Sequence, residues 1–239
     1  ELGVIFVNTF ISALLFRLGN VKKNIGYNRE GRGFLLDFSP EINYHKHYIN
    51  RYAFLFNEYI GNKYVYLPEL SLRYTGQKTF QFDNSHKTIA LYLGGENKEF
   101  RKYPDEYAVQ LLRLLNRQGY NLLLIGDEND NIKHTQYAEE ARIDHLINLT
   151  ARTTIEGFIN TIANVDLIIT IDSSALHIAA AVKTPFIALM GLSTSPTSTI
   201  LPKVPLGRIL KIENNLIREE DYIRNITPDL ILKTISELI

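Results

Sequence analysis

The chain has 239 residues, of which 45% are hydrophobic and 22% charged, and its formal net charge is zero. These values are ordinary for a folded globular protein, and the length allows one large or two small domains. A neutral chain has no global attraction to nucleic acid or to an anionic membrane. The absence of cysteine excludes disulfides and thiolate metal sites, and it fits a reducing cytosol.

The first eighteen residues predict a strand over 4–7 and a helix over 12–18, both inside a folded domain. A membrane span needs ~20 nearly uninterrupted apolar residues, and polar side chains interrupt these runs at Asn8, Thr9, Ser12 and Arg17. A signal peptide needs a basic start, and none precedes these runs. Because the chain begins with Glu1 in the middle of an element, we expect that a segment upstream is missing from this sequence.

A basic cluster follows, made of Lys22, Lys23, Arg29 and Arg32. The favoured interpretation is a solvated face, and a binding site for phosphates or carboxylates is the alternative. Residues 74–87 are polar and predict a linker. We therefore expect a partial N-terminal α/β domain over 1–75 and a second domain over 76–239.

From Thr88 onward the pattern alternates regularly between strands and helices. Apolar runs predict strands over 88–93, 121–125, 146–148, 167–171 and 186–190. Helical spacing and capping residues predict helices over 105–118, 132–141 and 175–182, a helix through 163 that the capping box Thr153–Glu156 opens, and a last helix from Thr227-Pro228 to 238. This order predicts a parallel, Rossmann-like sheet.

The polar triplet Asp172-Ser173-Ser174 lies where a predicted strand ends and a helix begins. Parallel α/β sheets bind ligands at the carboxyl ends of their strands. A helix N-terminus offers N–H groups to an anion, here those of Ser173, Ser174 and Ala175. The triplet therefore suggests a site for a phosphate-bearing ligand, with His177 one helical turn further on. The alternative is an aspartate that caps the helix, with an incidental histidine.

Further candidates follow the neighbouring strands. Glu128 and Asp130 come after Gly126, where a carboxylate can accept hydrogen bonds from a ribose diol; a helix cap is the alternative. Arg101 and Lys102 follow a Gly-Gly loop and precede a helix, and a solvated basic turn is their alternative. Other chemistries lack their motifs, because the sequence contains no Walker loop, GxGxxG, HExxH, Asp-x-Asp or Gly-x-Ser-x-Gly. We expect no metal and no cofactor.

Several segments, taken in chain order, resemble glycosyltransferase family 9, the ADP-heptose:lipopolysaccharide heptosyltransferases. The resemblance covers roughly residues 85–239 and rests on Ile89–Gly95, Arg101–Pro104, Leu122–Gly126, Asn148–Thr150 with Thr153–Gly157, Asp172–His177, Thr184-Pro185 and Gly191. Three positions depart from the family pattern: Arg101 replaces a lysine, Tyr103 a tryptophan and Ser174 a glycine.

The resemblance implies a GT-B fold, with a donor half and part of an acceptor half. It implies inverting, metal-independent transfer of heptose from ADP-heptose to the lipopolysaccharide core. The residues implied for the donor phosphates and sugar are Arg101, Lys102, Asp172, Ser173, Ser174 and His177. Those implied for the nucleoside are Glu128, Asp130, Thr153 and Thr154, the last two through backbone contacts with adenine. The basic cluster near the N-terminus could bind phosphates of the acceptor.

The family's catalytic base is an aspartate near the start of its chain, and no residue of this sequence matches it. We therefore expect the chain alone to bind nucleotide but to transfer sugar poorly. The resemblance also implies a cytoplasmic protein with at most peripheral contact with the inner face of the cytoplasmic membrane, and no nucleic-acid partner. Two alternatives stay open: a GT-B enzyme that uses another sugar nucleotide, and a non-catalytic nucleotide-binding module without the base.

Overall fold

The computed structural model describes residues 1–66, 69–82, 86–192, 197–202, 204–212, 216 and 218–239. The chain divides into two compact units, one made of residues 1–69 and 195–201 and the other of residues 70–194 and 202–239. Part of the predicted linker over 74–87, residues 83–85, lies outside the described residues. Within the described part of the chain, no helix combines the length and the apolar character needed to cross a membrane.

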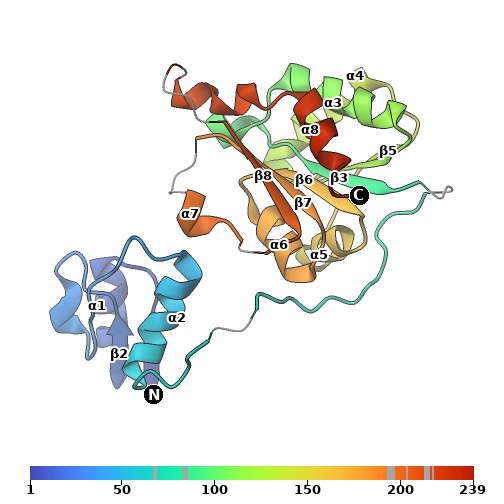
Figure 1. The fold of residues 1–239 in the computed structure, drawn as a ribbon. Coiled ribbons are helices and arrows are strands. Elements are labelled where there is room, and N and C mark those ends of the chain that lie inside the picture. The colour runs from blue at the N-terminus through green and yellow to red at the C-terminus, as the bar shows by residue number, and fades with distance from the viewer. Residues whose placement is uncertain (67–68, 83–85, 193–196, 203, 213–215, 217) are drawn as a thin grey trace. The chain divides into compact units, whose positions relative to one another are not determined.

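The second unit is built on a six-stranded parallel sheet (Figure 1). The strand order is β5-β4-β3-β6-β7-β8. The strands are β3 (Thr88–Tyr92), β4 (Asn121–Leu124), β5 (Leu146–Asn148), β6 (Leu167–Ile171), β7 (Phe186–Met190) and β8 (Gly207–Lys211). The chain first moves outward from β3 to β5 and then returns to place β6 on the other side of β3. The strand order therefore reverses between β3 and β6, where open α/β sheets commonly bind their ligands.

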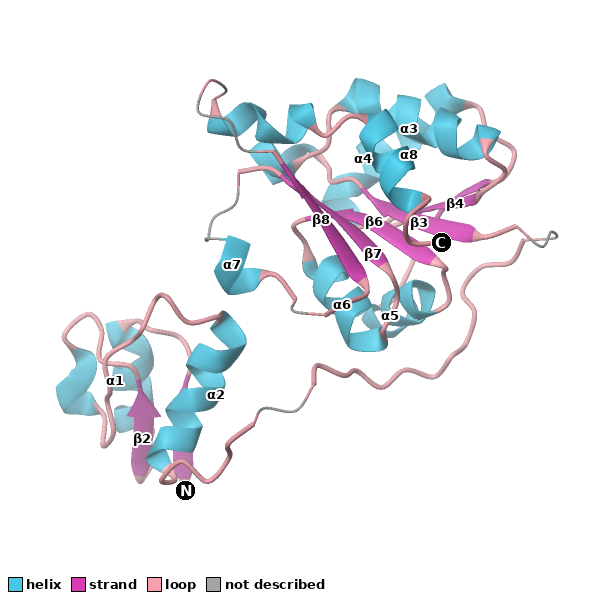
Figure 2. Ribbon diagram, in the orientation of Figure 1, coloured by secondary structure: helices cyan, strands magenta, loops and turns pink. Residues whose placement is uncertain are grey.

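Helices cover both faces of this sheet, with α3, α4 and α8 on one face and α5 and α6 on the other (Figure 2). They are α3 (Asp105–Arg117), α4 (Asn131–Ala141), α5 (Ile155–Ala163), α6 (Ser174–Val182) and α8 (Pro228–Ile235). β3, β4, β6 and β7 are buried along their whole length. Strands covered on both faces are apolar along most of their length, and this explains runs such as Ile89–Leu91 and Leu122–Leu124.

Helix α3 shows why these segments fold as they do. Its apolar side chains at 108, 111, 112 and 115 recur at helical spacing, and all are fully buried against the sheet. Pro104 precedes its first turn, which carries Asp105 and Glu106 at the positive end of the helix dipole. Gly119 follows the helix with φ +82°, a conformation that favours glycine.

The α/β class with a parallel sheet, predicted from the sequence, is confirmed. Strands β5, β6 and β7 have the predicted bounds, and β3 and β4 end one residue earlier than predicted. Sequence reasoning missed β8, because its residues are half-exposed or exposed and do not form an apolar run. It also placed the end of the last helix at 238, whereas α8 ends at Ile235.

The first unit contains a two-stranded parallel sheet, β1 (Leu2–Ile5) beside β2 (Lys23–Gly26). Helix α1 (Phe10–Leu18) connects the strands, and the short helix η1 (Arg32–Leu35) follows. Two further helices belong to this unit, α2 (Tyr48–Tyr59) and α7 (Thr197–Ile200). The strand and helix predicted near the N-terminus are present, whereas the Tyr-rich α2 was not predicted.

Arg32 corrects one expectation, because its side chain is fully buried and so it is no part of a solvated basic face. Its Nε donates to the carbonyl of Tyr27 (2.9 Å), and its two other nitrogens donate to the carbonyls of Val7 and Thr9, to Ser12 Oγ and to Asn8 Oδ1. A guanidinium with five donors can satisfy so many acceptors at once. Arg32 therefore fixes the loop between β1 and α1, and burial lowers its pKa.

Candidate functional site

The predicted site residues lie at the carboxyl ends of β3, β4, β5 and β6. Strand β3 pairs with β6 in a register that sets Tyr92 opposite Thr170. Beyond this pair, Gly94 lies close to the side chain of Ile171, the last residue of β6. The glycine loop after β3 and the polar triplet after β6 therefore face each other at the switch point of the sheet.

Ser173 is the N-cap of α6 and has extended backbone geometry. Its Oγ accepts a hydrogen bond from the amide of Ala175 (3.2 Å) and lies 3.0 Å from Oγ1 of Thr170. The amide of Ala175, which we expected to face a pyrophosphate, is thus already bonded within the cap. Ser174 and His177 are exposed, and Asp172 is half-buried. The junction presents short polar side chains and a helix N-terminus to solvent, as an anion site requires.

The loop after β3 packs tightly against its neighbours. Gly94 has φ +82°, and a Cβ atom on it would lie 2.7 Å from Cδ1 of Ile171. A Cβ atom on Gly95 would lie 2.4 Å from the carbonyl oxygen of Asn129. Because no larger residue fits either position without rearrangement, the two glycines allow the loops after β3, β4 and β6 to converge.

The loop after β4 contains a reciprocal cap that involves one of the predicted carboxylates. Asp127 caps the short helix η3 (Glu128–Asp130), and Oδ2 of Asp130 accepts a hydrogen bond from the Asp127 amide (3.0 Å). Asp130 is fully buried, and burial raises its pKa. Glu128 is exposed. The structure thus places Asp130 as a capping group and Glu128 at the rim; a role in ribose binding stays a prediction for both.

Three residues of this loop region were not identified from the sequence: Tyr92, Lys98 and Asp127. Lys98 lies in the helix η2 (Glu96–Arg101), and its Nζ lies 3.0 Å from Asp127 Oδ2, which also accepts a hydrogen bond from Tyr92 (3.3 Å). Partial burial pushes the pKa of Asp127 upward, but Lys98 and the amide of Asn129 hold it below its usual value. An aspartate directly after a strand-ending glycine, with a second one three residues later, was the available signal.

The two predicted phosphate-binding cations differ in their surroundings. Lys102 Nζ lies 2.8 Å from Asp105 Oδ1. Asp105 also contacts Lys133 (3.1 Å) and accepts a hydrogen bond from Tyr137 (2.5 Å). Partial burial opposes ionisation, but these donors together lower the pKa of Asp105 to about 2. The Arg101 side chain makes no hydrogen bond or ion pair with the part of the chain that the structure describes, so its guanidinium is the better placed for a ligand phosphate.

The turn after β5 precedes α5 and contains the predicted nucleoside residues. Oγ1 of Thr154 accepts a hydrogen bond from the amide of Gly157 (3.1 Å), so Thr154 caps the helix. The predicted capping box began one residue earlier, at Thr153, which is half-buried. Tyr103, where the family pattern has tryptophan, is fully buried and donates to the carbonyl of Ile226 (2.8 Å).

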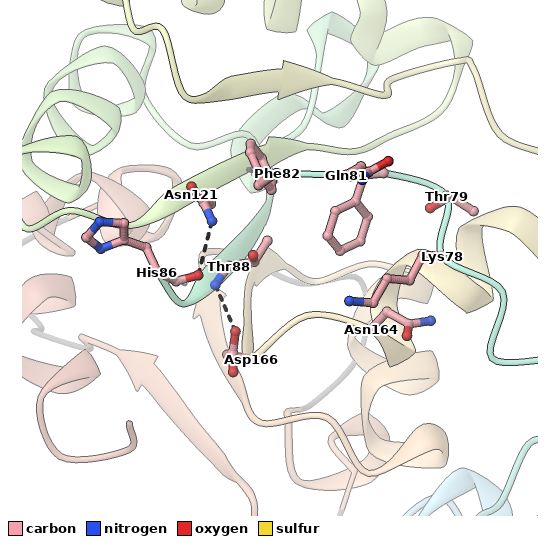
Figure 3. A pocket seen from close by; sticks show the side chains of 10 residues that line it. Lys78, Thr79, Gln81, Phe82, His86, Thr88, Asn121, Asn164 and Asp166 are labelled. Atoms are coloured by element: carbon pink, nitrogen blue, oxygen red, sulfur yellow. Dashed lines mark hydrogen bonds between the residues drawn. The ribbon is translucent and has the colours of Figure 1, made fainter. Parts of the chain in front are cut away.

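A cavity of about 790 Å³ lies at the opposite, amino ends of the strands, where Thr88 and Asn121 begin β3 and β4 (Figure 3). Its polar groups connect the preceding loops to the strands: the Thr88 amide donates to Asp166 (2.8 Å) and the Asn121 side chain to the His86 carbonyl (3.0 Å). None of the predicted site residues lines it. Because ligands of open α/β sheets bind at the carboxyl ends of the strands, we place the candidate site there and not in this cavity.

Among the described residues, no group of three or more His, Asp or Glu side chains could hold a metal ion.

The sequence profile of glycosyltransferase family 9 (heptosyltransferase) matches residues 2–220 of this chain. The chain belongs to glycosyltransferase family 9. A lipooligosaccharide heptosyltransferase 2 of Haemophilus influenzae is a 26% identical family relative, in an alignment that covers all of this chain and 76% of the relative. A lipopolysaccharide heptosyltransferase 2 of Salmonella typhimurium is 23% identical over 97% of this chain and 73% of the relative.

Solved structures confirm the family fold. The structure of E. coli ADP-heptose lps heptosyltransferase II superposes with a TM-score of 0.84 at 21% identity and covers all of this chain, which spans 76% of that structure. The E. coli heptosyltransferase WaaC, solved with ADP-2-deoxy-2-fluoro heptose, gives a TM-score of 0.73 at 17% identity, with 99% and 72% coverage. This chain therefore has the fold of part of a GT-B heptosyltransferase.

Proposed function

We propose that this protein binds ADP-heptose at the carboxyl edge of its six-stranded sheet and takes part in transfer of heptose to the lipopolysaccharide core. The observation that carries the proposal is the helix N-terminus at Ser173–Ser174, which lies at the switch point of the sheet in a family 9 chain. The WaaC structure with an ADP-heptose analogue supports the choice of ligand class.

The proposed ligand-binding role of each residue follows from its surroundings. Arg101, without a protein partner among the described residues, neutralises the diphosphate, and Asp172, Ser173, Ser174 and His177 contact the phosphates and the sugar. Glu128, at the exposed rim, is the more accessible acceptor for the ribose diol, with Asp130 as the alternative. Backbone atoms at Thr153 and Thr154 receive the adenine. Lys102 contributes less, because Asp105 already holds its ammonium group.

The reaction is a single displacement with inversion. The oxygen of an acceptor hydroxyl forms a bond to the anomeric carbon of heptose, and the bond from that carbon to the phosphate oxygen breaks. ADP leaves with the electron pair, while a carboxylate base takes the hydroxyl proton. Arg101 and the N-terminus of α6 stabilise the charge that develops on the leaving diphosphate. We propose that these 239 residues lack a counterpart of the family's base, and we therefore expect them to bind nucleotide without efficient transfer.

Calorimetric titration with ADP, UDP, GDP and CDP, without added metal, tests the proposal. We expect selective binding of ADP, weakened about tenfold or more by Arg101→Ala, since this change removes a charged contact with the diphosphate. Asp172→Ala should weaken binding less, because a carboxylate can only accept hydrogen bonds from hydroxyl groups of the ligand. Lys102→Ala has a smaller effect. Arg117→Ala is the matched control, because Arg117 is exposed at the far end of α3.

Selectivity for another nucleotide would keep the fold and overturn the heptose assignment in favour of another sugar-nucleotide enzyme. Absence of binding to all four nucleotides would contradict the proposed site. A transfer assay with ADP-heptose and a core acceptor addresses the base separately, and normal turnover would contradict our expectation of poor transfer. Nucleotide binding without transfer would also be the behaviour of a non-catalytic module.

A further inference from the structure

Helix α4 supports the two loops proposed to hold the nucleoside, and it does so with two buried polar side chains. Asp130, the residue that precedes the helix, and His134 are four residues apart, and both are fully buried. Asp130 fixes the loop after β4 through the Asp127 amide. His134 Nδ1 lies 2.8 Å from Thr150 Oγ1, in the turn after β5. Asp130 has right-handed helical backbone geometry directly before α4, so it lies on the same side as His134 four residues later, and the start of α4 holds both loops.

The turn after β5 needs such support, because its backbone is strained. Ala151 has φ +59°, in the left-handed region that costs a non-glycine residue about 1–2 kcal/mol. Its amide donates to the carbonyl of Gly126 (3.1 Å), and the Thr150 amide donates to Asn148 Oδ1 (3.0 Å). These bonds attach the turn to the sheet, whereas the contact between His134 and Thr150 attaches it to α4.

His134 has no direct access to a ligand, because none of its surface is exposed. Burial lowers its pKa to about 4, so its ring is neutral at physiological pH and can share a hydrogen bond with a threonine hydroxyl. Nε2 of this ring is buried without a hydrogen-bond partner among the described residues. Retaining a buried imidazole with one unsatisfied nitrogen is costly, and this cost points to a function for the bond that the ring does make.

We propose that His134 is a positioning residue, which acts through Thr150 to hold the turn 150–154 where it can receive the base of a bound nucleotide. This inference rests on the proposed function, because the turn receives a base only if the carboxyl edge binds a nucleotide. His134 sets the base-binding turn from the first turn of α4, and Asp130, the last residue of η3 directly before α4, sets the ribose-side loop. The spacing between the two subsites is therefore built into α4.

The test compares a ligand that has a base with one that lacks it. Calorimetry measures the affinity of the full chain for ADP and for inorganic pyrophosphate, in the wild type and in the His134→Ala, His134→Asn and Thr150→Val variants. We expect His134→Ala and Thr150→Val each to weaken ADP binding about tenfold and to leave pyrophosphate binding unchanged. His134→Asn should recover most of the affinity, because its amide can replace Nδ1.

The double variant His134→Ala/Thr150→Val should weaken ADP binding no more than either single change, since both remove one bond. Thr150→Ser, which retains the hydroxyl, and Gln136→Ala, on the exposed side of α4, are the matched controls. Unchanged ADP affinity in a folded Thr150→Val variant would overturn the proposal, and so would equal losses for ADP and pyrophosphate. If the wild type binds no ADP, the proposed function itself fails, which is a different result.

Discussion

The two compact units bury different kinds of side chain. The six-stranded sheet and the helices α3, α4 and α8 enclose a hydrophobic core made largely of Leu and Ile, which also contains the buried rings of Tyr103 and Tyr137. The first unit, as far as the structure describes it, buries at least as many polar side chains as apolar ones. Its buried apolar residues are Ile5, Ala13, Ile25, Tyr27 and Leu55, and its buried polar or charged residues are Asn24, Arg32, His47, Arg51, Asn57 and Thr199.

Two buried arginines organise the loops of the first unit. Arg32 holds the loop between β1 and α1. Arg51 donates to the carbonyls of Tyr44 (2.9 Å) and Lys46 (3.1 Å), and its guanidinium lies 4.4 Å from the ring centre of Tyr48. A sheet unit stabilised by apolar burial tolerates the loss of one polar contact, whereas loops held by a guanidinium lose several hydrogen bonds at once. Because of this difference, we expect the loss of one polar side chain to destabilise the first unit more than the sheet unit.

The largest expected effect is that of Arg32→Ala in the first unit. The change removes at once the hydrogen bonds that the buried guanidinium donates to the carbonyls of Tyr27, Val7 and Thr9 and to two side chains, and we expect a loss of roughly 3–5 kcal/mol in the free energy of unfolding of this unit. Urea unfolding followed by circular dichroism measures the loss, and limited proteolysis with mass spectrometry shows which unit opens.

Lys22→Ala, at an exposed position of the same segment, is the control and should change stability by less than about 0.5 kcal/mol. Equal effects of the two changes would remove the contrast between the units.

The second expected effect is acid sensitivity of the sheet unit through His134. An unfolded histidine titrates near pH 6.5, and His134 in the fold near pH 4. Between these values the unfolded state binds more protons, so the free energy of unfolding falls as the pH is lowered from 6.5 to 4, by roughly 3 kcal/mol at most. Urea unfolding at a series of pH values measures this slope.

The asparagine side chain in His134→Asn does not titrate in this range. The difference between the pH dependence of the variant's unfolding free energy and that of the wild type therefore isolates the contribution of His134. Parallel pH curves for the two proteins would show that protonation of His134 is not coupled to unfolding.

The smallest effect is expected for the ion pair between Lys98 and Asp127. The Asp127 side chain is 47% exposed, and exposed pairs contribute about 0.2–1 kcal/mol that salt screens further. We expect Lys98→Met to lower stability by less than 1 kcal/mol in low salt and by less still in 1 M salt, again measured by urea unfolding. A loss as large as that of Arg32→Ala would mean that charged loops matter as much to the sheet unit as to the first.

The same contrast explains what the sequence could predict. Apolar runs predicted β6 and β7 with their bounds, because strands buried on both faces carry few other residues. Asp172–His177 was correctly placed at a strand–helix junction, since the strand, the cap and the helix each leave a local signal. The burial of Arg32 was not predictable, because three of its five acceptors are backbone carbonyls, which any sequence possesses.

At the candidate site, the sequence identified residue types but not which partners they take. Asp130 fits both a ribose acceptor and a helix cap, and only the fold shows that it is buried in the cap. Lys102 and Arg101 are neighbours of similar charge, yet Asp105 contacts only one of them in the described structure. Which partner a side chain contacts depends on loops from distant parts of the chain, and no local sequence pattern encodes these contacts.

The two outer strands of the sheet have a consequence for solubility. A strand at the edge of a sheet has unpaired backbone groups that can recruit a strand of another molecule. At one edge, β5 has only three residues. At the other, β8 carries the exposed charges of Arg208 and Lys211, which would have to lose water if a second sheet paired with it. A short strand at one edge and a charged strand at the other thus protect this apolar sheet against edge-to-edge aggregation.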